Sequence, residues 1–84
     1  MASNFQNKTK LQLEKEGWIV IKIIRAGTSG WPDLFCFRKG VAKFIESKEK
    51  KDTTKPLQKL RIDQLRAEGF DAVSLHETKG IIYP

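Results

Sequence analysis

The chain has 84 residues, enough for one domain, and its 16 lysines and arginines against 10 aspartates and glutamates give a net charge of +6. This excess favours a polyanionic partner such as nucleic acid. No apolar run approaches the roughly 18 residues of a membrane span, the polar N-terminal segment is unlike a signal peptide, and one cysteine with one histidine excludes a disulfide or a zinc site. We therefore expect a single cytoplasmic domain over residues 1–84, with a small core that a dimer interface would help to stabilise.

The first two predicted elements are a helix over residues 4–16 and a strand over residues 18–26. Gly17 separates them, since glycine readily takes the left-handed conformation that ends a helix. The strand is β-branched and almost continuously apolar from residue 18 to residue 24. Such a run is typical of a central strand that is covered on both faces.

A β-hairpin is predicted next, with strands over residues 34–37 and 41–49. The first strand is rich in aromatic residues, and Lys39 with Gly40 supplies a short turn between the two strands. Cys36 lies inside the first strand, which predicts a buried and inert thiol.

The length of this turn fixes the register of the hairpin. A two-residue loop pairs Arg38 with Val41, and the same register sets Asp33 opposite Glu46. Lys48 shares a face with Glu46 because alternate residues of a strand point to the same side. The hairpin is therefore predicted to gather two carboxylates and one ammonium group at one end of a sheet.

This group of side chains has a chemical use. Two neighbouring carboxylates repel each other, and Mg²⁺ relieves the repulsion while taking its other ligands from water and phosphate oxygens. A bound cation can activate water, and a lysine such as Lys48 can stabilise the charge that develops on phosphorus. Gln58, in the first turn of the next helix, either points back to Asp33 and Glu46 or is solvated. The alternative for the whole group is a surface hairpin with alternating charges.

The second predicted helix covers residues 56–68. Leu57, Leu60 and Leu65 form its predicted buried stripe. Ile62 lies about 60° beyond this stripe at 100° per residue, so it is either exposed to solvent or reserved for a partner.

The C-terminal part predicts one further strand over residues 70–75. The helix before it acts as a crossover, so this strand can run parallel to the preceding one. His76 is predicted at the exposed end of the strand, with nothing nearby to orient it for catalysis. The apolar tail over residues 80–84 is expected to pair at a sheet edge or across a dimer interface.

The predicted order is α-β-β-β-α-β, an α/β fold in which helices flank a mixed sheet. Asp33 followed by Glu46-Ser47-Lys48 resembles the PD-(D/E)xK pattern of the restriction-endonuclease-like superfamily. Within it, the chain resembles the VRR-NUC family, the virus-type replication-repair nucleases. The segments that carry this likeness are Gly17-Trp18, Gly30-Trp31-Pro32-Asp33, Ile45-Glu46-Ser47-Lys48 and Pro56-Leu57-Gln58.

The resemblance implies a DNA endonuclease that depends on Mg²⁺ or Mn²⁺. Asp33 and Glu46 would be metal ligands together with the backbone carbonyl of Ser47, Lys48 would act on the nucleophile or the transition state, and Gln58 would support the site. Small stand-alone members are similar to archaeal Holliday-junction resolvases. A homodimer acting on branched DNA, in a bacterial or phage-infected cell, is therefore expected.

One position departs from this pattern. Related nucleases carry a glutamate on the first helix as an extra metal ligand, and the matching position falls near Gln6. Either Gln6 acts through a water molecule, or the metal site has fewer acidic ligands. The departure keeps a second hypothesis open, a nucleic-acid-binding module that retains the fold without catalysis. For the dimer contact, the sequence favours Ile62 and the apolar residues 81–83.

Overall fold

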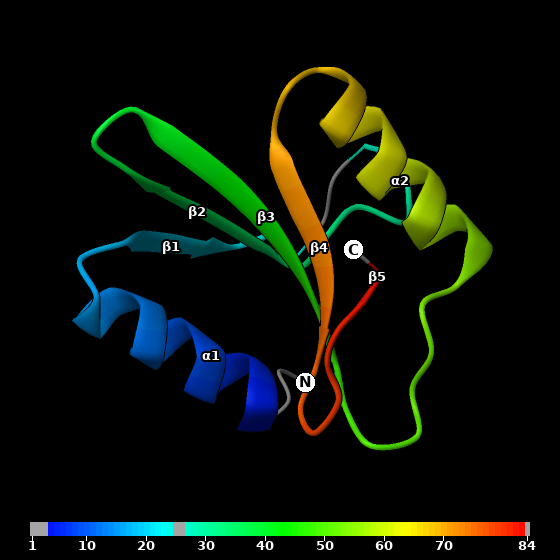
Figure 1. The fold of residues 1–84 in the computed structure, drawn as a ribbon, viewed down its shortest axis with the longest axis horizontal. Coiled ribbons are helices and arrows are strands. Elements are labelled where there is room, and N and C mark those ends of the chain that lie inside the picture. Colours follow the sequence, from blue (N-terminus) through cyan, green and yellow to red (C-terminus); the bar gives the residue numbers. More distant parts are fainter. Residues whose placement is uncertain (1–3, 25–26, 84) are drawn as a thin grey trace.

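The computed structural model describes residues 4–24 and 27–83, which form one five-stranded sheet with a helix packed on each face (Figure 1). The elements are α1 (Asn4–Lys15), β1 (Ile19–Lys22), β2 (Leu34–Arg38), β3 (Val41–Lys48), α2 (Pro56–Ala67), β4 (Asp71–His76) and β5 (Gly80–Tyr83). The strands follow one another across the sheet in chain order, and only β3 and β4 run parallel, because α2 crosses between them. The predicted α/β order is confirmed, and the C-terminal tail adds a fifth strand at the sheet edge.

The hairpin of β2 and β3 has the predicted register. Arg38 pairs with Val41 at the turn and Leu34 pairs with Ile45 at the far end. Lys39 and Gly40 both have positive φ values, 48° and 81°. Positive φ at both central residues is what a type I′ turn requires, and the twist of that turn matches the twist of the strands. Asp33 therefore lies opposite Glu46.

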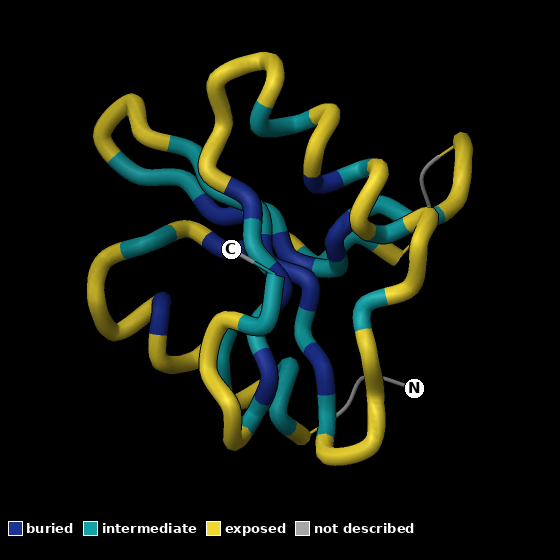
Figure 2. The backbone as a smooth tube through the Cα atoms, turned by 45° about the vertical axis from the view of Figure 1, so that its right-hand side comes forward, coloured by how far each residue is buried: buried dark blue, intermediate teal, exposed yellow. Residues whose placement is uncertain are grey.

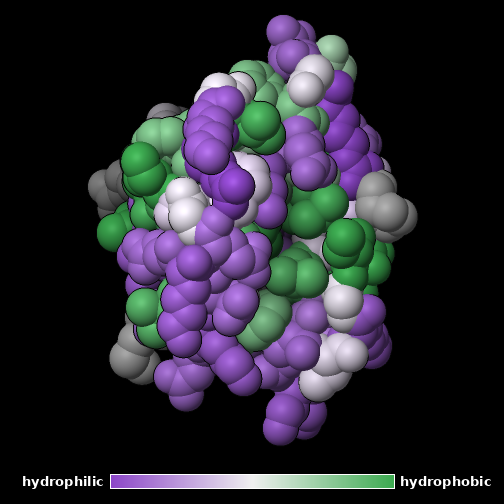
Figure 3. Space-filling model, turned by 60° about the vertical axis from the view of Figure 1, so that its left-hand side comes forward, coloured by the Kyte–Doolittle hydropathy of each residue, from purple (hydrophilic) through white to green (hydrophobic). Residues whose placement is uncertain are grey.

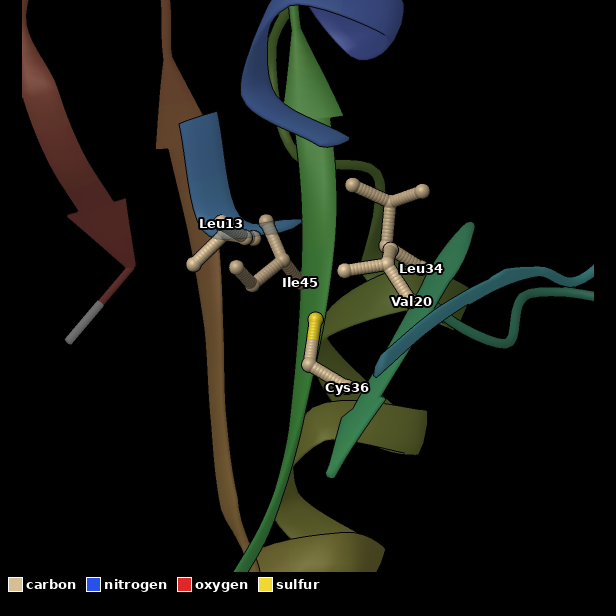
Figure 4. Packing of buried hydrophobic residues seen from close by; sticks show 5 residues of the cluster. All are labelled: Leu13, Val20, Leu34, Cys36 and Ile45. Carbon is tan, nitrogen blue, oxygen red and sulfur yellow. The ribbon is translucent and has the colours of Figure 1, made fainter. Parts of the chain in front are cut away.

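Alternate side chains divide the sheet into two faces with different contents. The face covered by α1 holds the apolar core (Figure 4). The buried members of this core are Leu13, Val20, Leu34, Cys36 and Ile45, and Trp18, Val73 and Leu75 pack against them. Cys36 is fully buried, as predicted, and burial raises the pKa of its thiol, which disfavours the reactive thiolate. The opposite face, here called the α2 face, carries Glu46 and Lys48.

The first strand was predicted to be central, and this prediction is wrong. β1 lies at the edge of the sheet and pairs only with β2. Val20 is its buried residue, whereas Ile19 and Ile21 are 56% and 49% exposed. Their side chains point to the α2 face, and α2 itself packs over β4, at the other side of the sheet. The predicted extension of this strand over residues 25–26 lies outside the described residues.

The predicted buried stripe of the second helix is wrong for two of its three leucines, and the third, Leu65, is half-buried. Leu57 and Leu60 are 41% and 49% exposed, whereas Ile62 is fully buried. The helix turns the line of Gln58, Ile62 and Arg66 inward, at the i, i+4, i+8 spacing of a helix face. The two polar members of this line have hydrogen-bond partners.

Those partners belong to the backbone of neighbouring segments. Gln58 accepts a hydrogen bond from the backbone N–H of Lys55 at 2.9 Å. Arg66 donates to the carbonyl oxygens of Ala72 and Tyr83 at 2.9 and 3.0 Å. Ile62 therefore belongs to the interior and is not available to a partner chain.

Buried residues follow the central strands, while the turns and the outer sides of both helices are exposed (Figure 2). In the part of the chain that the structure describes, neither α1 nor α2 has the length and apolar character needed to cross a membrane.

The inward position of Ile62 makes a prediction about stability. Ile62→Ala should lower the free energy of unfolding by roughly 2–5 kcal/mol, because it leaves a cavity in a fully buried place. Leu60→Ala, on the exposed side of the same helix, should cost less than about 1 kcal/mol. Urea denaturation of the two variants measures the difference, and a larger cost for Leu60→Ala would contradict the orientation of α2.

Candidate active site

Asp33, just before β2, is held by the residue after β1 and by β3. The backbone N–H of Ile23 donates to its carbonyl oxygen at 2.8 Å. Its carboxylate accepts hydrogen bonds from the backbone N–H of Ser47, at 3.1 and 3.3 Å, and from the Ser47 hydroxyl at 2.6 Å. Pro32 just before it is buried. The hairpin register and these contacts fix the acid beside β3.

Glu46 and Lys48 form a buried ion pair on β3. They are 7% and 6% exposed, and the Lys48 Nζ lies 3.6 Å from Glu46 Oε2. β3 has a neighbour on each side, β2 and β4, so both side chains point out of the middle of the sheet. Charged side chains are rarely buried unless they are paired, and this pair lies next to a second carboxylate, that of Asp33.

The surroundings of Glu46 disfavour a negative charge on its carboxylate. Burial raises the pKa of Glu46 from 4.5 to about 7, and the charge of Asp33 adds to the rise. The Lys48 ammonium lowers the pKa but does not cancel these effects, and Asp52 raises it slightly. Two carboxylates and one ammonium thus share a site in which one carboxylate holds a proton near neutral pH. A cation that binds there would replace that proton.

The donor set fits a hard divalent cation. Asp33 and Glu46 offer carboxylate oxygens, and the unfavourable charge on Glu46 is what such a cation would relieve. Among residues 4–24 and 27–83, no three His, Cys, Asp or Glu side chains gather in a metal-binding group. The remaining ligands would come from the backbone, water and phosphate oxygens, and Mg²⁺ commonly uses such a shell.

The structure brings some of the predicted residues together and leaves others apart. Asp33, Glu46, Ser47 and Lys48 meet at one end of β2 and β3. The side chain of Gln58 instead completes the first turn of α2. Gln6 lies on α1, which packs on the opposite face of the sheet from Glu46 and Lys48. The roles assigned to Gln6 and Gln58 stay predictions.

Trp31 lies in the loop that leads into Asp33, and the structure shows it packed. Its indole N–H donates to the Thr28 hydroxyl at 2.9 Å, and the Arg61 guanidinium lies 4.8 Å from the ring centroid. Arg61 also donates to the carbonyl of Ser29 at 2.9 Å. Gly30 has a φ of +91°, and a Cβ there would lie 2.6 Å from Leu57. This loop is therefore bound closely to α2.

His76 was predicted at an exposed end, but it is buried, 3% exposed, and paired in register with Lys48. Ser74 is fully buried on the same face and pairs with Glu46. Alternate residues of a strand share a face, so Ser74 and His76 lie on the same face as the buried Ala72, and this alternation could have predicted their burial. A polar row on β4 thus lies directly beside the candidate catalytic row on β3.

The fold and the site define the class of protein, an α/β nuclease fold with an aspartate before β2 and a Glu-x-Lys row on β3. The VRR-NUC domain model matches residues 6–78, and the chain belongs to this family of nucleases.

Comparison with solved structures agrees. The chain is similar to one described as a VRR_NUC domain, with 30% identity and a TM-score of 0.72 over 82% of this chain and 76% of that one. It shares its fold with Hjc, a Holliday junction resolvase from the archaeal hyperthermophile Archaeoglobus fulgidus, at 21% identity and a TM-score of 0.70 over 89% and 67% of the two chains. The comparison with curated proteins gave no match.

The raised pKa of Glu46 predicts how stability depends on pH. Between pH 4.5 and about 7 the folded chain keeps a proton that the unfolded chain releases. Without divalent cations, the free energy of unfolding should therefore fall as the pH rises through this range, by roughly 3 kcal/mol from Glu46 alone. Denaturation at several pH values measures the fall.

Glu46→Gln is the control for this measurement. The variant has no carboxyl group to titrate at position 46, so its free energy of unfolding should fall less with pH than that of wild type, by the contribution of Glu46. The variant should be more stable than wild type at pH 7.5. In wild type, Mg²⁺ should restore part of the stability at pH 7.5, because a ligand of the folded state stabilises it. If the free energy of unfolding depends on pH in the same way in both chains, the pKa of Glu46 is not raised by folding.

Proposed function

We propose that the chain is a divalent-metal-dependent DNA endonuclease that hydrolyses phosphodiester bonds, with branched DNA as its substrate. The single observation that carries the proposal is the buried pair of Glu46 and Lys48 beside the fixed carboxylate of Asp33. Burying charged side chains next to a second carboxylate is costly, which favours a functional role for the group. The excess of positive charge supports DNA as the partner.

In this proposal, Asp33 and Glu46 hold Mg²⁺ or Mn²⁺, with the Ser47 carbonyl as a further ligand. The bound ion supplies Lewis acidity at the phosphate and an activated water. Ser47 orients Asp33 through its N–H and its hydroxyl. Lys48 presents an ammonium group where negative charge develops on the phosphate oxygens, and burial strengthens that interaction.

A branched substrate is proposed from the solved structures to which the chain is similar. The Archaeoglobus protein that shares the fold is a Holliday junction resolvase, and this chain belongs to a family of nucleases. The second candidate is a binding module without catalysis, which the small number of acidic ligands favours. The intact pair of Glu46 and Lys48 favours the enzyme.

We also propose that the protein acts as a homodimer, through a surface that we call the aromatic sheet face. It lies on the α2 face of β1, β2 and β3 and at the residue before β4, away from the main contact of α2 with β4. Its members are Ile19, Ile21, Phe35, Phe37, Phe44 and Phe70.

The phenylalanine rings of this surface form one continuous row. Phe35 lies 5.3 Å from Phe37 and 4.9 Å from Phe44, and Phe44 lies 5.6 Å from Phe70 between ring centroids. Phe70 is 42% exposed and Ile21 is 49% exposed. Hydrophobic side chains reach the molecular surface between hydrophilic ones (Figure 3). A two-fold contact uses the same patch on both chains, and a patch of this kind marks a partner surface.

The endonuclease proposal is tested by cleavage of labelled four-way, flap, nicked and linear DNA. Wild type should cut branched DNA with Mg²⁺ or Mn²⁺ and fail with a chelator. Asp33→Asn, Glu46→Gln and Lys48→Ala should each lower the rate by at least about 100-fold. The control is Glu14→Gln, which removes an exposed carboxylate from α1 and should leave the rate unchanged. Binding without cleavage under every metal condition would select the non-catalytic module.

The dimer proposal is tested by sedimentation at micromolar concentration. Wild type should have about twice the 9.6 kDa mass of the chain. Ile21→Glu should give a folded monomer, because it places a charge in the apolar contact. Leu60→Glu alters an equally exposed residue outside the aromatic sheet face and should remain dimeric. A monomeric wild type, or dissociation by Leu60→Glu alone, would contradict this surface.

A further inference from the structure

β4 carries a buried polar row that the proposed chemistry does not use. Its side chains on the α2 face are those of Ala72, Ser74 and His76, which are 0%, 0% and 3% exposed. Buried polar groups need hydrogen-bond partners. Ser74 and His76 each have a partner in residues 49–55, which connect β3 to α2 and which we call the anchored loop.

The hydrogen bonds of His76 define the state of its ring. Nδ1 lies 3.1 Å from the backbone nitrogen of Thr78 and 3.2 Å from that of Lys79, and both amides donate to it. Nδ1 is therefore an acceptor, and the ring proton lies on Nε2. Nε2 faces the carbonyl oxygen of Lys50 at 3.1 Å and donates to it. The imidazole thus links the turn after β4 to the start of the anchored loop.

Further contacts hold the loop at both ends. Thr54 donates its hydroxyl hydrogen to the Ser74 hydroxyl at 2.7 Å. The backbone N–H of Lys50 donates to the Glu77 carboxylate at 2.8 Å, and the N–H of Glu77 donates to the carbonyl of Lys48 at 3.0 Å. The backbone of the loop is therefore held at both ends, and the loop begins at the residue after the candidate catalytic lysine.

The middle of the loop presents charge to solvent. Lys50 and Lys51 are exposed. No described carboxylate lies within 4.0 Å of either ammonium group, since the ion pairs among the described residues are Lys10 with Glu14 and Lys48 with Glu46. The loop follows directly on β3, whose last residue is Lys48. Two exposed ammonium groups without a carboxylate partner, on a loop whose backbone is anchored beside the candidate site, are suited to bind phosphate.

We propose that the anchored loop binds the phosphate backbone of DNA beside Lys48 through Lys50 and Lys51, and that His76 is the positioning residue that holds the loop in place. The proposal rests on the proposed function, because it assigns a DNA contact to the same site. His76 touches neither the reacting atoms nor the DNA. It acts through the carbonyl of Lys50, and its substitution changes where the lysines lie without changing their charge.

The test is the salt dependence of binding to a labelled four-way junction, measured in chelator at pH 8 so that no cleavage occurs. Each phosphate contact contributes about 0.9 to the slope of log K against log salt on duplex DNA. Lys50→Ala and Lys51→Ala should each reduce the slope by about that amount. Lys15→Ala, which removes an exposed charge at the end of α1, should leave it unchanged.

Two substitutions of His76 separate positioning from simple packing. The amide oxygen of His76→Asn can accept from Thr78 and Lys79, as Nδ1 does, but this side chain is too short to reach Lys50. His76→Asn should therefore lower the slope like a lysine substitution, although the formal charge is unchanged. In His76→Gln the amide nitrogen takes the place of Nε2 and donates to Lys50, so the slope should return to the wild-type value.

Several outcomes would overturn the proposal. Unchanged slopes for Lys50→Ala and Lys51→Ala would show that the loop does not contact phosphate, and these two variants stand even if His76 variants fail to fold. A loss of stability in both His76 variants at the wild-type slope would make the histidine structural only. If the two lysine variants show the predicted loss of slope but wild type never cuts DNA, the endonuclease proposal fails and the proposal for the loop stands. If wild type cuts DNA and the slopes of the two variants are unchanged, the endonuclease proposal stands and the proposal for the loop fails.

Discussion

The repulsion between the carboxylates of Asp33 and Glu46 is the constraint on which the rest of the structure depends. Burial alone disfavours the charge on Glu46, and Asp33 increases the penalty. The chain compensates locally, with Lys48 beside Glu46 and two donors from Ser47 on Asp33. The main apolar cluster lies on the α1 face, and the buried polar side chains Glu46, Lys48, Ser74 and His76 all lie on the α2 face, beside Ile62 and Ala72. The candidate site is therefore built on the face opposite the main core.

The hairpin could be predicted from the sequence because its determinants are local. A two-residue turn fixes the register, and the register places Asp33 opposite Glu46 whatever the rest of the chain does. The position of β1 in the sheet could not be predicted in this way. Apolar residues such as Ile19 and Ile21 show that a strand can be buried, but the covering element, α2, lies over β4 instead.

The inward side of α2 and the burial of His76 were not predicted from the sequence, for a different reason. Gln58 and Arg66 flank Ile62 on the buried line because backbone atoms satisfy their side chains, those of the N-cap Lys55 for Gln58 and those of Ala72 and Tyr83 for Arg66. His76 is buried because its ring bonds both to the loop after β3 and to the turn after β4. Polarity predicts exposure only where no partner is supplied, and hydrophobic periodicity carries no information about such partners.

The parallel pairing of β3 with β4 has a consequence for how the chain folds. The β2–β3 hairpin closes through a two-residue turn and needs only local contacts, whereas β3 meets β4 only after the whole of α2 has crossed between them. A hairpin alone leaves Asp33 and Glu46 opposite each other in water, where both acids are hydrated. The low-dielectric environment that perturbs Glu46 arises when β4 and α2 dock. The perturbed electrostatics of Glu46 therefore depend on the non-local pairing of β3 with β4 as well as on the local hairpin.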